Sequence, residues 1–164
     1  MEIYVLDSTY ALSNIIDSYK SFIWTERYRE AGDFELVIPY RDDLFEVLPL
    51  DAYLSIESSK TYMIVESIQV DSDFESGSVA IISGRSLESI LDRRVIWGQT
   101  QLTGKFQDGI KTLLNQNAIS PSNVNRKIPD FTFIESKDTD ILALTIDAQY
   151  YGDSLYDAIV AQCE

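Results

Sequence analysis

The sequence contains no histidine and a single cysteine, Cys163. Most hydrolytic triads and many zinc sites need an imidazole, so the missing histidine argues against these classes of site. A single cysteine cannot form an internal disulfide, and the fold is therefore expected to need no oxidising compartment. We expect a protein that is not an enzyme and that holds neither a cofactor nor a metal ion.

The sequence also lacks long apolar runs and is poor in basic residues. No stretch approaches the ~20 apolar residues that span a bilayer, and the first residues, MEIYVLD, lack the pattern of a secretory leader. We expect no membrane insertion and no signal peptide. Lys and Arg number 13 against 27 Asp and Glu, a net charge of −14. So acidic a surface repels phosphate and disfavours stable nucleic-acid binding.

The acidic excess lies mostly in the first half of the chain. Residues 1–84 hold sixteen acidic and five basic side chains, a net charge of −11, whereas residues 85–164 hold eleven and eight, a net charge of −3. The 164 residues are 45% hydrophobic and 24% charged. This composition is typical of a packed globular protein with one domain, or with one small domain and part of another.

Patterns typical of β-strands dominate the first half. In DFELVI, residues 33–38, apolar and acidic side chains alternate with period two. An antiparallel sandwich or barrel is predicted, with further strands at residues 2–7, 21–28, 52–57, 61–70 and 77–84, turns at 31–33, 38–43 and 71–77, and a short helix at 42–48. In the strand at 21–28, Phe22, Trp24 and Tyr28 are expected to share a face. The predicted buried core includes Phe34, Leu36, Ile38, Leu54, Ile56 and Ile64.

The hydrophobic period changes after Gly84. The predicted elements are a short helix at 86–91 capped by Ser86, a strand at 94–97, a helix at 105–117, a loop at 118–130, strands at 130–135 and 144–150, and a last helix capped by Asp153 or Ser154. We place a β domain at residues 1–96 and a partial α/β domain at 97–164. The apolar stripe of the last helix ends in mid-pattern, so we expect this domain to be truncated there.

Three motifs that could carry chemistry are better explained structurally. GRSLE, residues 84–88, has Glu88 where a nucleophile elbow needs its second glycine. DSDFESG, residues 71–77, lacks the glycine and glutamate of a calcium loop and predicts a hairpin turn. Carboxylate pairs such as Asp42 with Asp43 and Asp138 with Asp140 occur by chance on any acidic surface. A Gly-rich phosphate-binding loop is also missing.

Three arginines, Arg85, Arg93 and Arg94, cluster where the hydrophobic period changes. They could pair locally with Glu88 and Asp92, which contributes little at a surface. Alternatively, they could bridge two domains or two subunits, because an arginine fork orients a carboxylate partner. We take these three arginines as interface candidates and expect at least one to pair with a carboxylate outside residues 84–98.

Several ordered stretches resemble the N-terminal region of siphophage tail-hub proteins: FIWTERYREAGDFELVIP at 22–39, YLSIESS at 53–59, YMIVESI at 62–68, GRSLESILDRRVIWGQT at 84–100 and YGDSLYDAI at 151–159. The resemblance covers almost the whole chain. This family occurs in phages and prophages of Gram-positive bacteria. The resemblance implies tail-tube-like β-barrel domains with a smaller α/β domain, similar to the baseplate hub of contractile-tailed phages, and three copies in a ring at the distal end of the tail tube.

This resemblance implies a structural virion protein at the tail tip, made in the bacterial cytoplasm. Its implied partners are two further copies in the full-length protein, the distal tail ring and tape-measure-type tail proteins, and DNA passes through the ring without stable binding. The implied function includes host attachment. Two alternatives stay open: the hub region of a tail-associated peptidoglycan hydrolase, and a host-glycan-binding module.

Overall fold

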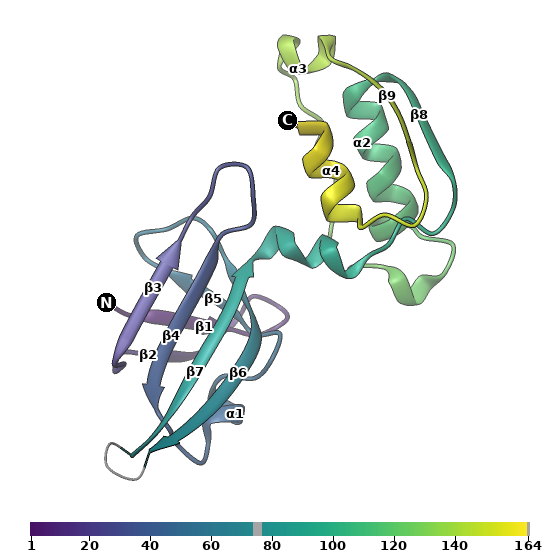
Figure 1. Cartoon of the computed structure of the whole chain (residues 1–164). Coiled ribbons are helices and arrows are strands. Elements are labelled where there is room, and N and C mark those ends of the chain that lie inside the picture. The colour runs from purple at the N-terminus through teal and green to yellow at the C-terminus, as the bar shows by residue number, and fades with distance from the viewer. Residues whose placement is uncertain (74–76, 164) are drawn as a thin grey trace. The chain divides into compact units, whose positions relative to one another are not determined.

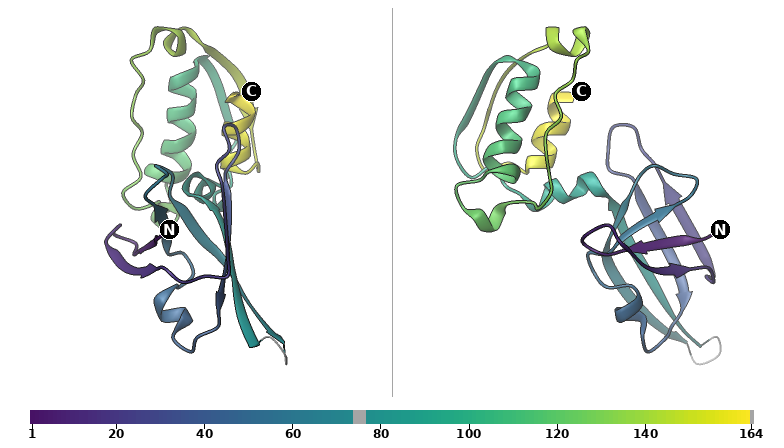
Figure 2. Two further views of the ribbon diagram at one scale, coloured as in Figure 1. Left: turned by 90° about the vertical axis from the view of Figure 1, so that its left-hand side faces the viewer. Right: turned by 180° about the vertical axis from the view of Figure 1, so that it is seen from behind.

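The computed structural model describes residues 1–73 and 77–163. The chain divides into two compact units, Met1–Leu87 and Glu88–Glu164, which we call the first and second units. Figures 1 and 2 show a β-sheet in the first unit and a mixture of helices and a two-stranded sheet in the second. From the sequence, the boundary between the two domains was expected at Ile96. That residue packs in the core of the second unit, as does Leu91.

One seven-stranded antiparallel sheet forms the first unit, with strand order β2-β1-β5-β6-β7-β4-β3. Its elements are β1 (Ile3–Leu6), β2 (Leu12–Ile16), β3 (Ser21–Thr25), β4 (Asp33–Pro39), helix α1 (Leu44–Val47), β5 (Tyr53–Ile56), β6 (Met63–Asp73) and β7 (Gly77–Ser86). Strands β1 and β2 run across the direction of β3, β4 and β7 (Figures 1 and 2). The sheet therefore folds over onto one of its own faces.

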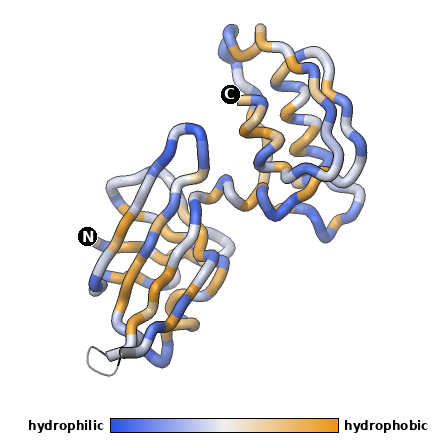
Figure 3. The backbone as a smooth tube through the Cα atoms, viewed as in Figure 1, coloured by the Kyte–Doolittle hydropathy of each residue, from blue (hydrophilic) through white to orange (hydrophobic). Residues whose placement is uncertain are grey.

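That inner face holds a single hydrophobic core, to which every strand of the first unit and α1 contribute. Alternation fixes which residues face inward: Phe34, Leu36 and Ile38 of β4 are buried, whereas Glu35 between them is exposed. All six residues predicted as core are buried. Apolar residues line the strands, and the β3–β4 loop is hydrophilic (Figure 3). The mainly β, antiparallel fold is therefore confirmed.

Three details of the first unit differ from the sequence prediction. Strand β2 was missed because its polar centre, Asn14, interrupts the apolar pattern; the Asn14 amide donates to the Val47 carbonyl at 3.3 Å. Strand β3 ends at Thr25, so Tyr28 does not share a face with Phe22 and Trp24 and is 99% exposed. The predicted turn at 71–77 falls partly outside the described residues; of its described residues, Asp73 ends β6 and pairs with Gly77, which begins β7.

The second unit combines a two-stranded antiparallel sheet with helices. Its elements are the 3-10 helix η1 (Leu87–Arg93), β8 (Thr100–Lys105), α2 (Phe106–Leu114), the π-helix η2 (Asn115–Ile119), the 3-10 helix η3 (Val124–Arg126), α3 (Thr139–Ala143), β9 (Thr145–Tyr150) and α4 (Leu155–Cys163). The first residue of η1, Leu87, is the last residue of the first unit. Helix α2 packs on β8 and β9 so closely that a Cβ on Gly109 would lie 2.8 Å from Ile146 Cγ2.

The sequence located the helices of this unit better than its strands. Strand β9 and helix α4 are confirmed, and the Asp157 amide donates to Ser154 Oγ at 3.4 Å, as a cap requires. The predicted helix at 105–117 is α2 continued by η2. The strand predicted at 130–135 is wrong, since these residues form no ladder in the described chain, and β8 was missed. At 94–97 only a single bridge forms, between Val95 and Ser154.

Candidate interaction surfaces

The end of β7 is shaped by close approach of neighbouring strands. Gly84 lies between Phe34 of β4 and Val65 of β6. A Cβ there would lie 1.8 Å from the Ile64 carbonyl oxygen and 2.8 Å from Phe34 Cε1, so no larger residue fits without a shift of the backbone. The glycine that marks the change of hydrophobic period is therefore a packing requirement of the first unit.

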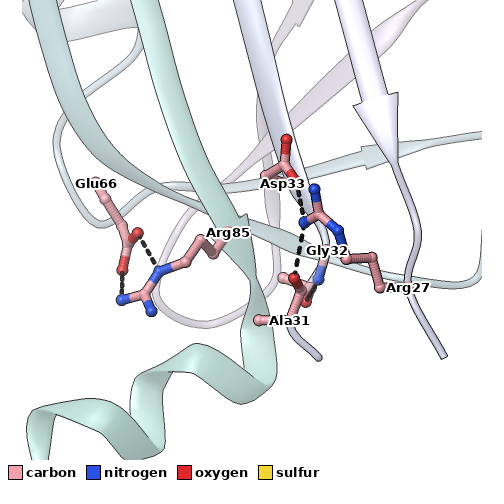
Figure 4. A network of polar contacts seen from close by, with 7 residues as sticks. Arg27, Ala31, Gly32, Asp33, Glu66 and Arg85 are labelled. Atoms are coloured by element: carbon pink, nitrogen blue, oxygen red, sulfur yellow. Dashed lines mark hydrogen bonds and ion pairs between the residues drawn. The ribbon is translucent and has the colours of Figure 1, made fainter. Parts of the chain in front are cut away.

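Arg85 forms a two-pronged ion pair with Glu66 (Figure 4). Its Nε donates to Glu66 Oε2 at 2.8 Å and its Nη2 to Oε1 at 3.0 Å. Glu66 is the extra residue of a β-bulge, because Val65 pairs with Gly84 and Ser67 with Ser83. A bulge re-aims the side chain that it carries, and here it aligns the carboxylate with the guanidinium. Arg85 thus pairs with a carboxylate outside residues 84–98, as predicted.

A second polar cluster closes the loop between β3 and β4 (Figure 4). Arg27 forms an ion pair with Asp33 and donates to the Ala31 carbonyl at 3.1 Å. The Gly32 amide donates to Ser86 Oγ at 2.7 Å, and the Ser86 amide donates back to the Gly32 carbonyl at 2.9 Å. Ser86, predicted as a helix cap, is therefore the last residue of β7 and ties this loop to it.

Arg94 lies in the second unit, in surroundings different from those of Arg85. Its Nε donates to the Arg126 carbonyl at 2.6 Å and its Nη1 to the Arg93 carbonyl at 3.0 Å. Arg126 donates in turn to the carbonyl of Val95 and to Asn117 Oδ1 at 3.4 Å. Burial lowers the pKa of Arg94, and the positive charges of Arg126 and Arg93 lower it further. The structure separates Arg85 from the other two arginines, and the interface role of all three stays a prediction.

Two exposed aromatic residues of the second unit were not predicted from the sequence. Trp97 is 77% exposed and Tyr151 is 71% exposed. Their two segments are joined by the Ile96 amide donating to the Asp153 carbonyl and by the Gly152 amide donating to the Ile96 carbonyl, both at 2.8 Å. The alternation around Ile96, which is fully buried, was the available signal, because it directs the side chain on each side outward.

The first unit carries a separate tyrosine cluster. Tyr10 stacks on Tyr53 with ring centroids 4.9 Å apart and meets Tyr62 edge-on at 6.1 Å. Tyr62 also lines an open hollow of about 360 Å³, together with Tyr4 and polar residues that include Glu57 and Lys60. The Tyr4 hydroxyl donates to Glu2, which raises the pKa of Tyr4. Aromatic faces beside polar groups are the usual lining of a binding hollow.

Among residues 1–73 and 77–163, no group of three or more metal-ligating side chains could hold a metal ion. In the same residues, no helix is long and apolar enough to cross a membrane. In each of the two carboxylate pairs considered from the sequence, one member accepts local hydrogen bonds. Asp43 accepts both prongs of Arg41, which lowers the pKa of Asp43, and Asp138 Oδ1 accepts the Asp140 amide as a helix cap.

Residues 2–161 match the family of Siphovirus ReqiPepy6 Gp37-like proteins. Among solved structures, the chain is similar to the prophage tail protein gp18 from Listeria monocytogenes EGD-e, with 11% sequence identity and a TM-score of 0.60. That similarity covers 99% of this chain and 44% of the Listeria protein, so the chain spans less than half of its length. At this identity the similarity concerns the fold. No curated protein matches the sequence.

Proposed function

Because the chain belongs to the family of Siphovirus ReqiPepy6 Gp37-like proteins, we propose that it is a structural protein of the virion tail. Its specific role is to form part of the ring that closes the distal end of a phage tail tube. The observation that carries this proposal is the fold similarity, over 99% of the chain, to a protein described as a prophage tail protein. The proposal gives the chain an assembly function and no catalytic step.

The charge of the chain fits a ring through which DNA passes. The net charge is −14, and the first unit, residues 1–87, holds sixteen acidic and six basic side chains, a net charge of −10. Stable binding to DNA depends on basic side chains that neutralise phosphates and release counterions. An acidic lumen prevents this binding, so the strand moves without being held.

The ring consists of three copies of the full-length protein at the tail tip. It contacts the distal tail ring and tape-measure-type proteins above it and takes part in host attachment below. Arg85, Arg93 and Arg94 are the candidates for contacts between units or copies. Arg85 already pairs with Glu66 of its own unit, and its side chain is still 38% exposed at the end of β7.

Electron microscopy of purified tails with a labelled antibody against this chain tests the proposal. Label at the distal tip, together with three subunits counted in the ring of the full-length protein, is the expected result. Label along the tube, on the capsid or nowhere on the particle would overturn it. Hydrolysis of purified peptidoglycan by the isolated chain would favour the hydrolase alternative instead.

The tyrosine cluster favours one second candidate function, the binding of a host glycan. Tyr62 is 41% exposed and borders the hollow that Glu57 and Lys60 also line. Binding on a glycan array that is lost in Tyr62→Ala and kept in Tyr28→Ala would support this function. If the chain binds no glycan, the structural role is the candidate function that remains.

A further inference from the structure

The second unit presents a surface whose composition is unusual for a solvent-exposed region. We call it the Trp97 patch and define it as Val95, Trp97, Tyr151, Arg94 and Arg126. Val95 is 42% exposed, Trp97 77% and Tyr151 71%, and both arginines are half-buried. Large aromatic residues are on average well buried in folded proteins. Trp, Tyr and Arg are also the residues that contribute most to binding at protein–protein interfaces.

The patch is held in shape before any partner arrives. Hydrogen bonds between Ile96 and residues 152–153 align its two backbone segments, and the Leu155 amide donates to the Arg94 carbonyl at 2.8 Å. The two arginines are fixed by backbone carbonyls, since Arg94 donates to that of Arg126 and Arg126 to that of Val95. A surface that is already ordered loses little side-chain entropy on binding.

Charge determines the kind of partner. Burial lowers the pKa of Arg94, and repulsion from the positive charges of Arg126 and Arg93 lowers it further. Within the described residues, Arg94 and Arg126 donate to backbone carbonyls and to Asn117 Oδ1, and neither forms an ion pair with a carboxylate. An acidic protein surface would relieve this repulsion. Within this chain, the first unit, with its net charge of −10, is such a surface.

We propose that the Trp97 patch docks on the acidic first unit of a second copy of this chain. The contact joins two different surfaces, so each copy offers one of each. Such head-to-tail contacts close into rings when the rotation between copies allows it. The inference rests on the proposed ring function and names the surface of the second unit that would build the ring.

Sedimentation velocity of the purified chain over increasing concentration tests this contact. The wild type is expected to self-associate, and to do so less as salt rises, because salt screens the attraction between charged surfaces. The double variant Trp97→Ala/Tyr151→Ala should weaken association at least about tenfold, a loss of about 1.4 kcal/mol. Ile134→Ala, which removes an 86% exposed side chain of the second unit that is not part of the patch, is the matched control and should associate as the wild type does.

Mixing the double variant with the wild type distinguishes this contact from other modes of association. The double variant keeps its first unit, so it should add to one end of a wild-type assembly and lower the average size. A chain that stays monomeric at every concentration would overturn the inference, as would unchanged association of the double variant. If Trp97 fluorescence indicates a buried side chain and does not change with concentration, the patch contacts the first unit of its own chain and not that of a second copy. Self-association is measured without particles, so it fails or succeeds separately from tail-tip labelling.

Discussion

The two units are stabilised in different ways. In the first unit, alternate side chains of one seven-stranded sheet pack into a single core. In the second, faces of α2 and α4 and the segment that carries Phe131 and Phe133 surround a core with only two paired strands. The first unit therefore depends on strand register, whereas the second depends on how separate elements pack. A change in one unit should leave the other intact, because their cores share no residue in the described chain.

The largest effect is expected from Gly84→Ala. The new methyl group would overlap the Ile64 carbonyl at 1.8 Å, a backbone atom that cannot move without breaking the ladder. The cost should exceed the roughly 3 kcal/mol typical of severe overpacking, and the melting transition of the first unit should disappear. Gly98→Ala is the matched control, since nothing lies within 4 Å of a Cβ there. Equal melting curves for the two variants would contradict this account.

Leucine truncation compares the two cores directly. Leu36 and Leu113 are both fully buried, the first in β4 and the second in α2. Each change to alanine should cost about 2–5 kcal/mol, and each should lower the melting temperature of its own unit alone. Calorimetry of the whole chain resolves the two transitions. A single transition that either variant lowers equally would mean that the units unfold together.

A smaller effect is expected from the Arg85–Glu66 pair. The Glu66 side chain is 24% exposed and the Arg85 side chain 38%, so solvent screens the pair in part. A double-mutant cycle with Arg85→Ala and Glu66→Ala should give a coupling of about 0.2–1 kcal/mol, the range for exposed pairs. High salt should reduce this coupling. A coupling of zero at low salt would show that the two-pronged geometry adds nothing to stability.

Acid sensitivity should give the smallest effects, one in each unit. Hydrogen bonds from the Thr9 hydroxyl and then from the Thr9 and Ala11 amides lower the pKa of Asp7, and Lys111 lowers the pKa of Glu135 in the same sense. A lowered pKa contributes stability at neutral pH that is lost as pH falls through the folded-state value. Asp7→Asn should flatten the acid dependence of the first unit, and Glu135→Gln that of the second.

Melting curves recorded from neutral to acidic pH test both changes. The asparagine oxygen still accepts hydrogen bonds but does not titrate, so Asp7→Asn isolates the effect of protonation. Each variant also serves as the control for the other unit. Acid dependence that is the same in wild type and variants would contradict the assignment.

The sequence predicted the first unit better than the second for physical reasons. Strands that bury every second residue in one core show apolar residues with period two in the sequence. Of the strands of the first unit, only β2, interrupted by Asn14, was missed. In the second unit, Phe131 and Phe133 alternate in the same way but pack against the core without a ladder. Strand β8 has the opposite property, since it is paired along its length but carries few apolar residues.

Residues of the interaction surfaces could be predicted where a local sequence pattern marks them, and not where distant segments meet. Gly84 and Arg85 could be singled out because a local sequence change marked them. The bulge that brings Glu66 to Arg85 depends on a register shift between two strands, which no single segment encodes. Trp97 and Tyr151 lie more than fifty residues apart in the sequence, and their segments are brought together by backbone hydrogen bonds of Arg94 and Ile96 to residues 152–155.

The path of the chain between the units has a mechanical consequence. The chain enters the second unit directly from β7, which is bonded along its length to β6 on one side and β4 on the other. Ladder bonds in antiparallel strands run perpendicular to the strands. A pull on the second unit along β7 would therefore shear both ladders at once instead of opening one bond at a time. In a single-molecule pulling experiment, the first unit should therefore unfold only at high force.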